Sequence, residues 1–377
     1  MIIREAWLAR LERAWKEAPI VWLCGVRRSG KTTLAHSLDP DRTLYVNCDI
    51  PATEEMVRDP QLFFKNCRQP IVVFDEIHQL KDPSRILKIG ADLFPQFKIL
   101  ATGSSTLGAS RKFKDTLTGR KRTVHLLPVT VAELAAFHDA PLLKRLYHGG
   151  LPPALLADEK APAFYREWMD SFFARDVQKL FAFRNSEKFN AVFEYIMKQS
   201  GGMLEVSRMS SALAVARATI ETHLEALEIT HAVTLVRPFH GGGRKELVKT
   251  PKAYAFDTGF VSFHRGWDPL RPDDYGTLWE HLVLEYLQSK GIEKPQYWHD
   301  HAGKEVDFVI PRDRSTVDAV ECKWDPTRFD ATSIRLFREY YPEGVNYVVS
   351  PQTVPAYSRR ISGLEFHFCA PEGLRLT

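Results

Sequence analysis

The first third of the chain alternates short apolar runs with amphipathic stretches. Apolar residues recur at helical spacing over residues 4–17, which predicts an amphipathic helix near the start of the chain. Apolar runs with the length of buried strands follow at residues 20–24, 43–46, 71–74 and 97–101. Helical stretches lie between them, beginning with residues 32–38. This alternation predicts a parallel sheet that helices cover on both faces.

After Pro128 the pattern becomes helical, and it then changes twice more. Helices are predicted at residues 189–199, 206–213 and 217–229, followed by strands at 233–236 and 247–256 around a glycine-rich loop. Three helices and a hairpin in this order predict a winged helix-turn-helix. The remainder alternates again, with predicted helices at 278–288 and 333–340 and predicted strands at 306–310, 317–322 and 346–349.

Composition narrows the class of protein without identifying its function. A chain of 377 residues is too long for one ordinary core, so several domains are expected. The net charge of +4 permits a nucleic-acid partner without requiring one. Five scattered cysteines without CxxC spacing predict reduced thiols, no zinc site and a cytoplasmic location. No run of about 18 apolar residues is present, so no membrane span is expected.

The strongest chemical signal follows the first apolar run. Residues 25–32 fit the pattern G-x-x-x-x-G-K-[ST], between a predicted strand and a predicted helix. Such a loop curls around phosphate oxygens, while its lysine reaches the β- and γ-phosphates and its hydroxyl residue ligates Mg²⁺. We therefore predict that ATP is bound by Gly25, Arg28, Ser29, Gly30, Lys31, Thr32 and Thr33, with Thr32 also on the metal.

Two acids end the apolar run at residues 71–74. Asp75 and Glu76 would lie at the carboxyl edge of a buried strand, beside the phosphate loop. This position predicts Asp75 as a partner of Mg²⁺ and Glu76 as the base that orients the attacking water. Paired acids at a strand end are also common as a solvated strand exit, and the upstream phosphate loop favours the functional interpretation.

The phosphate loop and six later segments resemble one family along nearly the whole chain. These segments are residues 74–78, 101–105, 117–120, 149–152, 175–177 and 254–259. They are similar to a bacterial and archaeal family of AAA+ ATPases that carry a C-terminal domain of long-unassigned function. The resemblance implies an ATPase module, a winged helix and a domain of the restriction-endonuclease type.

Two further residues are candidates for the ATPase reaction. In AAA+ ATPases a polar residue after the third strand senses the γ-phosphate, which favours Ser104 over Thr102; the alternative is a Gly/Ser turn. Arg120 is placed to stabilise phosphoryl transfer across a subunit boundary, and the alternative is a solvated basic loop. An arginine supplied in this way requires a homo-oligomer, and we expect a ring.

Acids and a lysine near the C-terminus support the restriction-endonuclease assignment. Asp307 lies on a predicted strand, and Glu321-x-Lys323 follows 14 residues later on the next strand. In a PD-(D/E)xK site Asp307 and Glu321 would hold a second divalent cation, Mg²⁺ or Mn²⁺, and Lys323 would position the attacking water. Glu280 on the upstream helix would complete the site. Such domains are also retained for binding alone, so cleavage stays open.

In the predicted winged helix, the third helix is poorly suited to bind DNA and the hairpin is well suited to it. Its third helix is acidic, with Glu221, Glu225 and Glu228 against Arg217, which disfavours insertion into a major groove. The hairpin is basic, and its candidate DNA contacts are Arg237, Arg244, Lys245 and Lys249, with Lys252 adding to the positive charge against Glu246. The alternative is a winged fold used to pack against protein.

These patterns predict an α/β protein of four units. We expect a P-loop AAA+ parallel-sheet ATPase core at residues 1–130, a small helical lid at 131–186, a winged helix-turn-helix at 187–258 and a restriction-endonuclease-like α/β domain at 259–377. The predicted function is a Mg-ATP-hydrolysing motor that binds and remodels or translocates DNA, including branched DNA such as Holliday junctions. The alternative is an ATP-switched regulator of a protein partner, with a degenerate nuclease-like domain.

Overall fold

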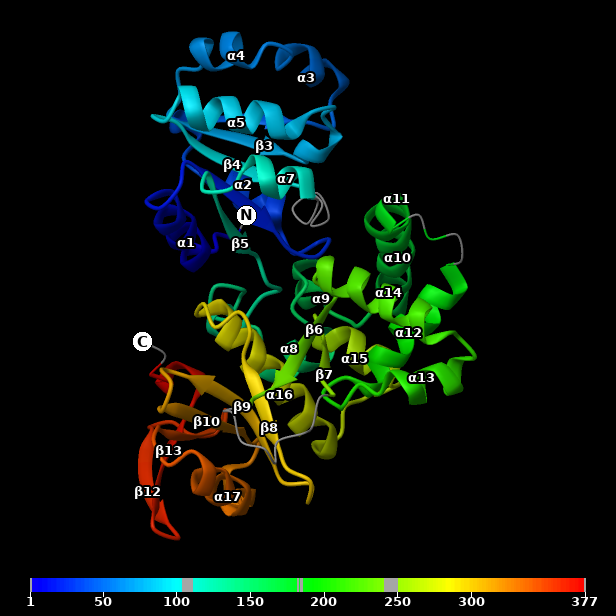
Figure 1. Cartoon of the computed structure of the whole chain (residues 1–377), viewed down its shortest axis with the longest axis vertical. Helices are drawn as coiled ribbons and strands as arrows, with labels where there is room; N and C mark the ends of the chain where they lie inside the picture. The colour runs from blue at the N-terminus through cyan, green and yellow to red at the C-terminus, as the bar shows by residue number, and fades with distance from the viewer. Residues whose placement is uncertain (1, 104–110, 182, 184–185, 241–249, 376–377) are drawn as a thin grey trace.

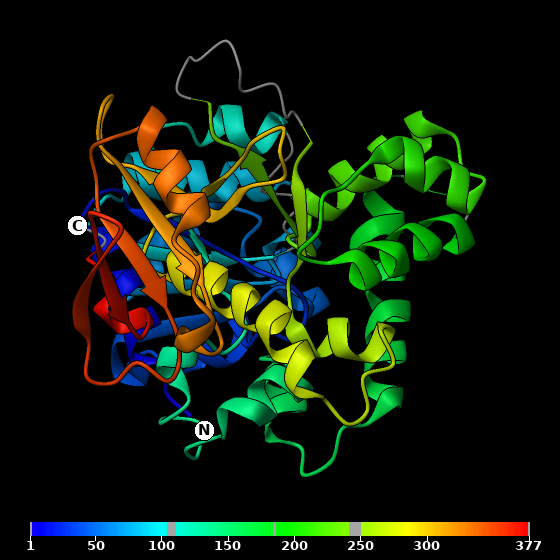
Figure 2. The same ribbon diagram turned by 90° about the horizontal axis from the view of Figure 1, so that it is seen from below.

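A computed structural model describes residues 2–103, 111–181, 183, 186–240 and 250–375. Two sheets lie toward opposite ends of the molecule, and a group of helices lies beside the line between them (Figure 1). The view from below shows the same helices projecting to one side, away from the C-terminal sheet (Figure 2). The chain thus separates into an N-terminal sheet unit, a helical unit and a C-terminal sheet unit.

The N-terminal sheet is parallel, with strand order β2-β3-β4-β1-β5. Its strands are β1 (Ile20–Cys24), β2 (Thr43–Asn47), β3 (Ile71–Asp75), β4 (Lys98–Thr102) and β5 (Lys121–His125). The helices of this unit are α1 (Glu5–Trp15), α2 (Lys31–His36), α3 (Pro51–Met56), α4 (Pro60–Asn66), α5 (Pro83–Leu93) and α7 (Arg111–Thr116). Separate apolar clusters pack on the two faces of the sheet, which confirms the predicted parallel α/β core.

The edge strand β5 was not predicted from the sequence. Only Val124 of its five residues is buried, so the run lacks the apolar signature of the central strands. Its backbone nevertheless pairs with β1 over the whole length of that strand. The segment after Gly119 is therefore a sheet edge rather than a solvated loop.

The helical unit begins with α8 (Leu142–His148), α9 (Pro152–Leu156) and α10 (Pro162–Phe172). A π-helical turn, Phe173–Val177, continues α10 into α11 (Gln178–Phe181). The next elements are α12 (Ser186–Gln199), α13 (Val206–Leu213), α14 (Arg217–Ile229), β6 (Val233–Pro238), β7 (Lys252–Ala255) and α15 (Thr258–His264). Three helices and an antiparallel hairpin thus occur in the predicted order.

The C-terminal sheet includes that hairpin. Its strand order is β12-β13-β11-β10-β9-β8-β6-β7, and β6 joins β8 through Arg237 and Pro238. The later elements are α16 (Pro272–Ser289), β8 (Gln296–His299), β9 (Glu305–Pro311), β10 (Val317–Cys322), α17 (Thr332–Tyr340), β11 (Asn346–Val349), β12 (Tyr357–Ile361) and β13 (Leu364–Cys369). The sheet therefore runs across the boundary predicted at residue 258. Strands β8, β12 and β13 were not predicted.

One apolar cluster joins the helical unit to the C-terminal sheet. It includes Trp168 of α10, Phe193 of α12, Leu282 of α16 and Val320 of β10. Within the described ranges, no helix is long and apolar enough to cross a membrane.

Candidate functional site

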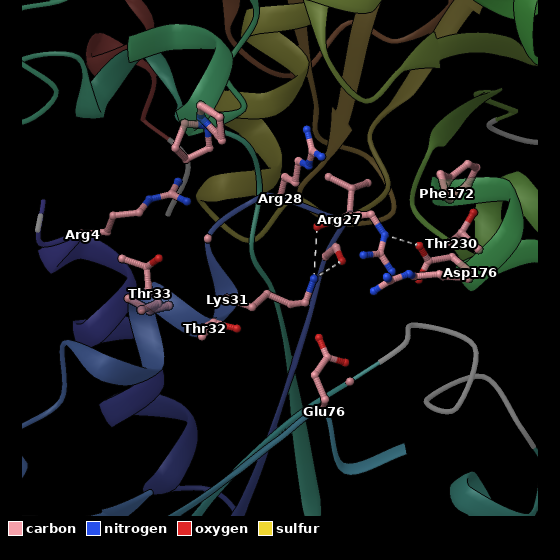
Figure 3. A pocket seen from close by; sticks show the side chains of 18 of the residues that line it. Arg4, Arg27, Arg28, Lys31, Thr32, Thr33, Glu76, Phe172, Asp176 and Thr230 are labelled. Carbon is pink, nitrogen blue, oxygen red and sulfur yellow. Dashed lines mark hydrogen bonds and ion pairs between the residues drawn. The ribbon is translucent and has the colours of Figure 1, made fainter. Parts of the chain in front are cut away.

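The phosphate loop connects β1 to α2, as predicted (Figure 3). Gly25, Arg28 and Gly30 have φ angles of 146°, 63° and 96°. A Cβ atom at Gly25 would lie 2.4 Å from the carbonyl oxygen of Leu126. The loop therefore passes so close to the segment after β5 that only glycine fits at this position. A curled loop of this kind presents backbone N–H groups to an anion.

The Lys31 ammonium lies against the same loop. Its Nζ donates to the carbonyl oxygens of Gly25 at 2.9 Å and Val26 at 3.1 Å. Burial lowers the pKa of Lys31, and the nearby carboxylates of Glu76 and Asp176 act in the opposite direction. The ammonium therefore satisfies its donors within the loop that would hold the triphosphate.

Asp75 is a buried carboxylate surrounded by hydroxyl donors. Its Oδ2 accepts hydrogen bonds from Thr32 Oγ1 at 2.9 Å and from the Tyr45 hydroxyl at 2.5 Å. Its Oδ1 accepts a hydrogen bond from Thr102 Oγ1. Three strands and the phosphate loop thus hold this side chain in one orientation, beside the Thr32 hydroxyl.

Glu76 follows in a left-handed conformation with φ of 54°. Its N–H donates to Thr102 Oγ1 at 3.1 Å, and its side chain lies 3.2 Å from Nδ1 of His78. Burial acts to raise the pKa of Glu76, but His78, Lys31 and Arg27 outweigh it and the pKa lies below the ordinary value. The carboxylate is therefore ionised at neutral pH, as a base requires.

Beside these groups lies a cavity of about 980 Å³, large enough for a nucleotide, and Asp75 is buried behind its lining. Lys31, Thr32 and Glu76 line one side (Figure 3). The opposite side comes from the helical unit, where the lining residues are Phe172, Arg175, Asp176 and Thr230. An ion pair of 2.9 Å between Arg27 and Asp176 joins the two sides.

A third part of the cavity is largely apolar. It is lined by Ile2, Phe137, Pro152, Pro153 and Leu156, from the N-terminal segment and the start of the helical unit. Arg4 anchors the N-terminal segment there, because its guanidinium pairs with Glu133 at 2.6 Å and donates to the Ser29 carbonyl at 3.2 Å. The polar and apolar parts of the cavity thus adjoin at the phosphate loop.

Some predicted ATP-site residues occupy other positions. The Ser29 side chain is fully buried and does not line the cavity, and its hydroxyl has no hydrogen-bond partner within the described part of the chain. Ser104 falls outside the described residues. Arg120 lies outside the cavity, partly exposed, and pairs with Asp92 of the same chain at 2.5 Å. Its role toward a neighbouring subunit stays a prediction.

The sequence analysis missed most of the residues that contact Asp75 and Glu76 or line the opposite side of the cavity. Tyr45, Thr102, His78, Asp176 and Thr230 come from five different segments. The order of hydroxyl residues after β4 gave a partial signal, since Thr102 was considered and Ser104 preferred. Asp176 lies in one of the segments that carry the family resemblance, but the pattern did not say what it contacts.

Other family-like segments meet in a structural contact. The Asp257 carboxylate accepts hydrogen bonds from the N–H groups of Gly150 at 2.6 Å and Gly259 at 2.8 Å. A Cβ atom at Gly149 would lie 1.9 Å from Asp257 Oδ1. Segments 149–152 and 254–259 therefore hold the C-terminal end of α8 against the N-terminal end of α15.

The four predicted nuclease-like residues are brought together. Lys323 Nζ lies 2.7 Å from Glu321 Oε1, and Asp307 Oδ2 accepts from the N–H of Cys322 at 2.7 Å. Burial raises the pKa of Asp307, with the Glu280 charge adding to the effect. Burial, with the Asp307 charge in addition, raises the pKa of Glu321 to about 8.

Two residues not assigned to this cluster lie inside it. Glu305 of β9 joins Glu280 and Asp307, and one oxygen of each lies within 4.8 Å of the others. Lys252 of β7, which was counted with the DNA-facing charge, is buried and pairs with Glu280 at 3.0 Å and with Glu305. The prediction that Lys252 adds to the charge facing DNA is therefore wrong, because a buried ammonium cannot contact a DNA backbone.

The remaining DNA-contact candidates are only partly described. The Arg237 side chain is 62% exposed and lies 3.4 Å from Glu228 of α14. Arg244, Lys245 and Lys249 fall outside the described residues. Their contact with DNA stays a prediction.

Comparison with known proteins supports the class of the N-terminal unit. Residues 17–135 match the family described as AAA domain, and residues 140–271 and 275–362 match two domains of unknown function, DUF8612 and DUF4143. Together with the parallel sheet and the phosphate loop, the first match supports an AAA+ P-loop ATPase that uses a nucleotide and Mg²⁺.

Two relatives with similar sequences are described as uncharacterized proteins. An uncharacterized protein of Mycobacterium tuberculosis (strain H37Rv) is 27% identical and matches over 82% of this chain and 71% of its own length. An uncharacterized protein of Haemophilus influenzae is 22% identical over 82% of this chain and 84% of its own. Among solved structures, the Thermotoga maritima RuvB Holliday junction branch migration motor is 19% identical with a TM-score of 0.31, covering 63% of this chain and 90% of that one.

Proposed function

We propose that this protein hydrolyses Mg-ATP in the cavity beside the phosphate loop and uses the energy to act on DNA. The convergence of Lys31, Thr32, Asp75 and Glu76 carries the first part. An ammonium, a hydroxyl paired with a buried carboxylate and an ionised second carboxylate are the donor set that Mg-ATP hydrolysis needs. These residues fit the nucleotide and its metal, with Thr32 and Asp75 as the residues that would hold Mg²⁺.

In this proposal each residue beside the cavity has one role in hydrolysis. Magnesium, when bound, neutralises charge on the β- and γ-phosphates. Lys31 turns from the loop carbonyls to the phosphate oxygens, and Glu76 orients a water for in-line attack and accepts its proton. Tyr45 and Thr102 hold Asp75, while His78 holds the carboxylate of Glu76. The apolar part of the cavity, with Phe137 and Pro152, suits the flat face of the adenine ring of ATP.

Coupling to the rest of the chain would begin at Thr230. This residue lines the cavity, follows the last residue of α14 as its C-cap and lies three residues before β6. The next residue, His231, stacks on His125 at the end of β5 with ring centroids 4.0 Å apart. A change of nucleotide would therefore act directly on the base of the β6–β7 hairpin.

DNA is the partner that the charge of this hairpin favours. Residues 237–252 include Arg237, Arg244, Lys245 and Lys249 against Glu246. Basic side chains around a glycine-rich loop can follow a phosphate backbone. An oligomeric ring, with Arg120 acting on a neighbouring subunit, belongs to the same proposal.

ATP turnover in the presence of DNA tests this proposal. We expect duplex, single-stranded or four-way DNA to raise the rate several-fold, and Arg244→Ala/Lys245→Ala to remove the increase without lowering basal turnover. Arg359→Ala/Arg360→Ala is the matched control, because these exposed arginines lie on β12 at the opposite edge of the same sheet. Turnover that none of the three DNAs changes would reject DNA as the partner.

The alternative is an ATP-switched regulator that acts on a protein. One observation favours it, namely that Lys252 is paired inside the nuclease-like carboxylate cluster. Under this alternative the ATPase site and its coupling to the hairpin are unchanged, and only the partner differs.

A further inference from the structure

Lys252 is fixed in the sheet next to the carboxylate cluster. It is the first residue of β7, pairs with Val236 of β6 and forms a bridge with Met203 on the other side. The carbonyl groups just before it are also used, because Thr250 accepts from the Tyr297 hydroxyl and Pro251 accepts from the N–H of Leu204. Backbone pairing on both sides fixes the main chain of this residue, and its side chain is only 5% exposed.

Its ammonium reaches the carboxylates at the place where a cation would bind. Lys252 Nζ lies 3.0 Å from Glu280 Oε1 and contacts Glu305 still more closely. These two acids and Asp307 offer oxygens that all lie within 4.8 Å of one another. A divalent ion bound by those oxygens would be in contact with the ammonium, and two cations at that separation repel each other in this half-buried site.

Two neighbouring residues also donate hydrogen bonds to the carboxylates of this cluster. The Tyr254 hydroxyl donates to the Glu280 oxygen that Lys252 contacts, and Cys322 N–H donates to Asp307. Glu321 is 8% exposed and pairs with Lys323 through one oxygen, while its Oε2 has no hydrogen-bond partner in the described parts of the chain. Lys252 thus occupies the position beside Glu280 and Glu305 that a cation held by these carboxylates would take.

We propose that Lys252 is the permanent counter-ion of this cluster and that it excludes the divalent cation a PD-(D/E)xK nuclease requires. The residues therefore do not fit the second Mg²⁺ or Mn²⁺ that the sequence analysis expected. The cluster instead fastens the β6–β7 hairpin to α16 and β9, and the C-terminal unit binds its partner without cutting DNA. This inference is independent of ATP hydrolysis.

Replacement of the ammonium by a metal ion tests the inference. Lys252→Ala removes the buried charge and leaves space among half-buried carboxylates, so we expect its melting temperature to fall by several degrees in EDTA. Millimolar Mn²⁺ should restore most of that loss, because a ligand that binds only the folded state stabilises it. The wild type without nucleotide should show no Mn²⁺ shift. Lys252→Ala/Asp307→Asn, which lacks one metal ligand, should not respond to Mn²⁺.

Two outcomes would overturn the inference. In the first, Mn²⁺ raises the melting temperature of the wild type as much as that of Lys252→Ala, and Asp307→Asn abolishes this increase. Metal would then bind beside the lysine. The second is a folded Lys252→Ala that ignores Mn²⁺. If Lys252→Ala does not fold, equilibrium dialysis of nucleotide-free wild type decides: Mn²⁺ binding equal to that of Asp307→Asn supports the inference, and greater binding rejects it.

Discussion

At the scale of single residues, the ATP site depends on how two adjacent acids are held. Asp75 is surrounded by the hydroxyls of Thr32, Tyr45 and Thr102, which fix the orientation of the carboxylate that we propose as a partner of Mg²⁺. Glu76 adopts a left-handed conformation, which a non-glycine residue adopts at a cost of about 1–3 kcal/mol. Contacts with Thr102 and His78 hold this conformation, in which Glu76 lines the cavity and Asp75 does not.

The change Glu76→Gln separates binding of ATP from its hydrolysis. The amide keeps the shape of the side chain but cannot accept a proton, so we expect the dissociation constant for ATP to change little. Steady-state turnover should fall at least ~100-fold, the usual contribution of a positioned base. The control is Glu55→Gln, an exposed acid of α3 paired with Arg58. Near-normal turnover by Glu76→Gln would assign the base to another residue.

At the scale of elements, close backbone contact joins α8 to α15. A Cβ atom at Gly259 would lie 2.3 Å from the carbonyl oxygen of His148, the last residue of α8. The Arg145 guanidinium crosses the same contact, donating to Thr258 Oγ1 at 2.9 Å and pairing with Glu285 of α16. The glycines of segments 149–152 and 254–259 are therefore explained by close packing.

We expect Gly259→Ala to destabilise the protein by about 1–3 kcal/mol, because the added methyl group must displace backbone atoms. Gly276→Ala is a matched control, since Gly276 lies within helix α16 and a Cβ atom there would meet nothing within 4 Å. That change should be neutral or stabilise by up to about 1 kcal/mol. Urea unfolding of both variants measures the difference. Equal stability of the two variants would mean that α8 and α15 separate without cost.

At the scale of the whole molecule, helix α16 connects all three units. Its last carbonyl groups accept from Arg10 of α1, at 3.4 Å for Gln288 and 3.1 Å for Ser289. On the same helix His281 Nε2 lies 2.7 Å from the Ser200 hydroxyl, which accepts from the N–H of Ala255 in β7. A helix with contacts in every unit is suited to transmit changes at the ATP site to the C-terminal sheet.

His281 should make this connection sensitive to acid. Burial lowers the pKa of His281 to about 4, with Arg265, Lys252 and Arg145 acting in the same direction. Because the folded-state pKa lies below the unfolded value of 6.5, the folded state disfavours the proton. The stability from neutral His281 is complete above pH 6.5 and is lost as pH falls toward 4, by at most about 3 kcal/mol.

The measurement is the free energy of unfolding in urea at several pH values across that window. We expect His281→Gln to show a shallower loss of stability with falling pH than the wild type does. The comparison isolates His281 from the other buried histidines, which contribute with the same sign in both proteins. Parallel pH profiles for the two proteins would contradict the assignment.

The sequence by itself determined the ATP site and the central strands. The phosphate loop and the positions of Asp75 and Glu76 are readable because they depend on local order: a buried strand, a loop and a helix, then acids at the end of another buried strand. Short apolar runs predicted β1 to β4 for the same reason. Edge strands such as β5 and β12 carry polar side chains on their exposed positions and left no such signal.

Only the tertiary structure decided which distant residues meet. The helical unit closes the ATP cavity through Asp176 and Thr230, and β6 continues into the C-terminal sheet through its pairing with β8. The same pairing carries Lys252 into the carboxylate cluster, where a residue that the sequence suggested for DNA becomes a buried counter-ion. Pairing between strands depends on contacts across the whole fold, and a linear pattern of charges does not contain them.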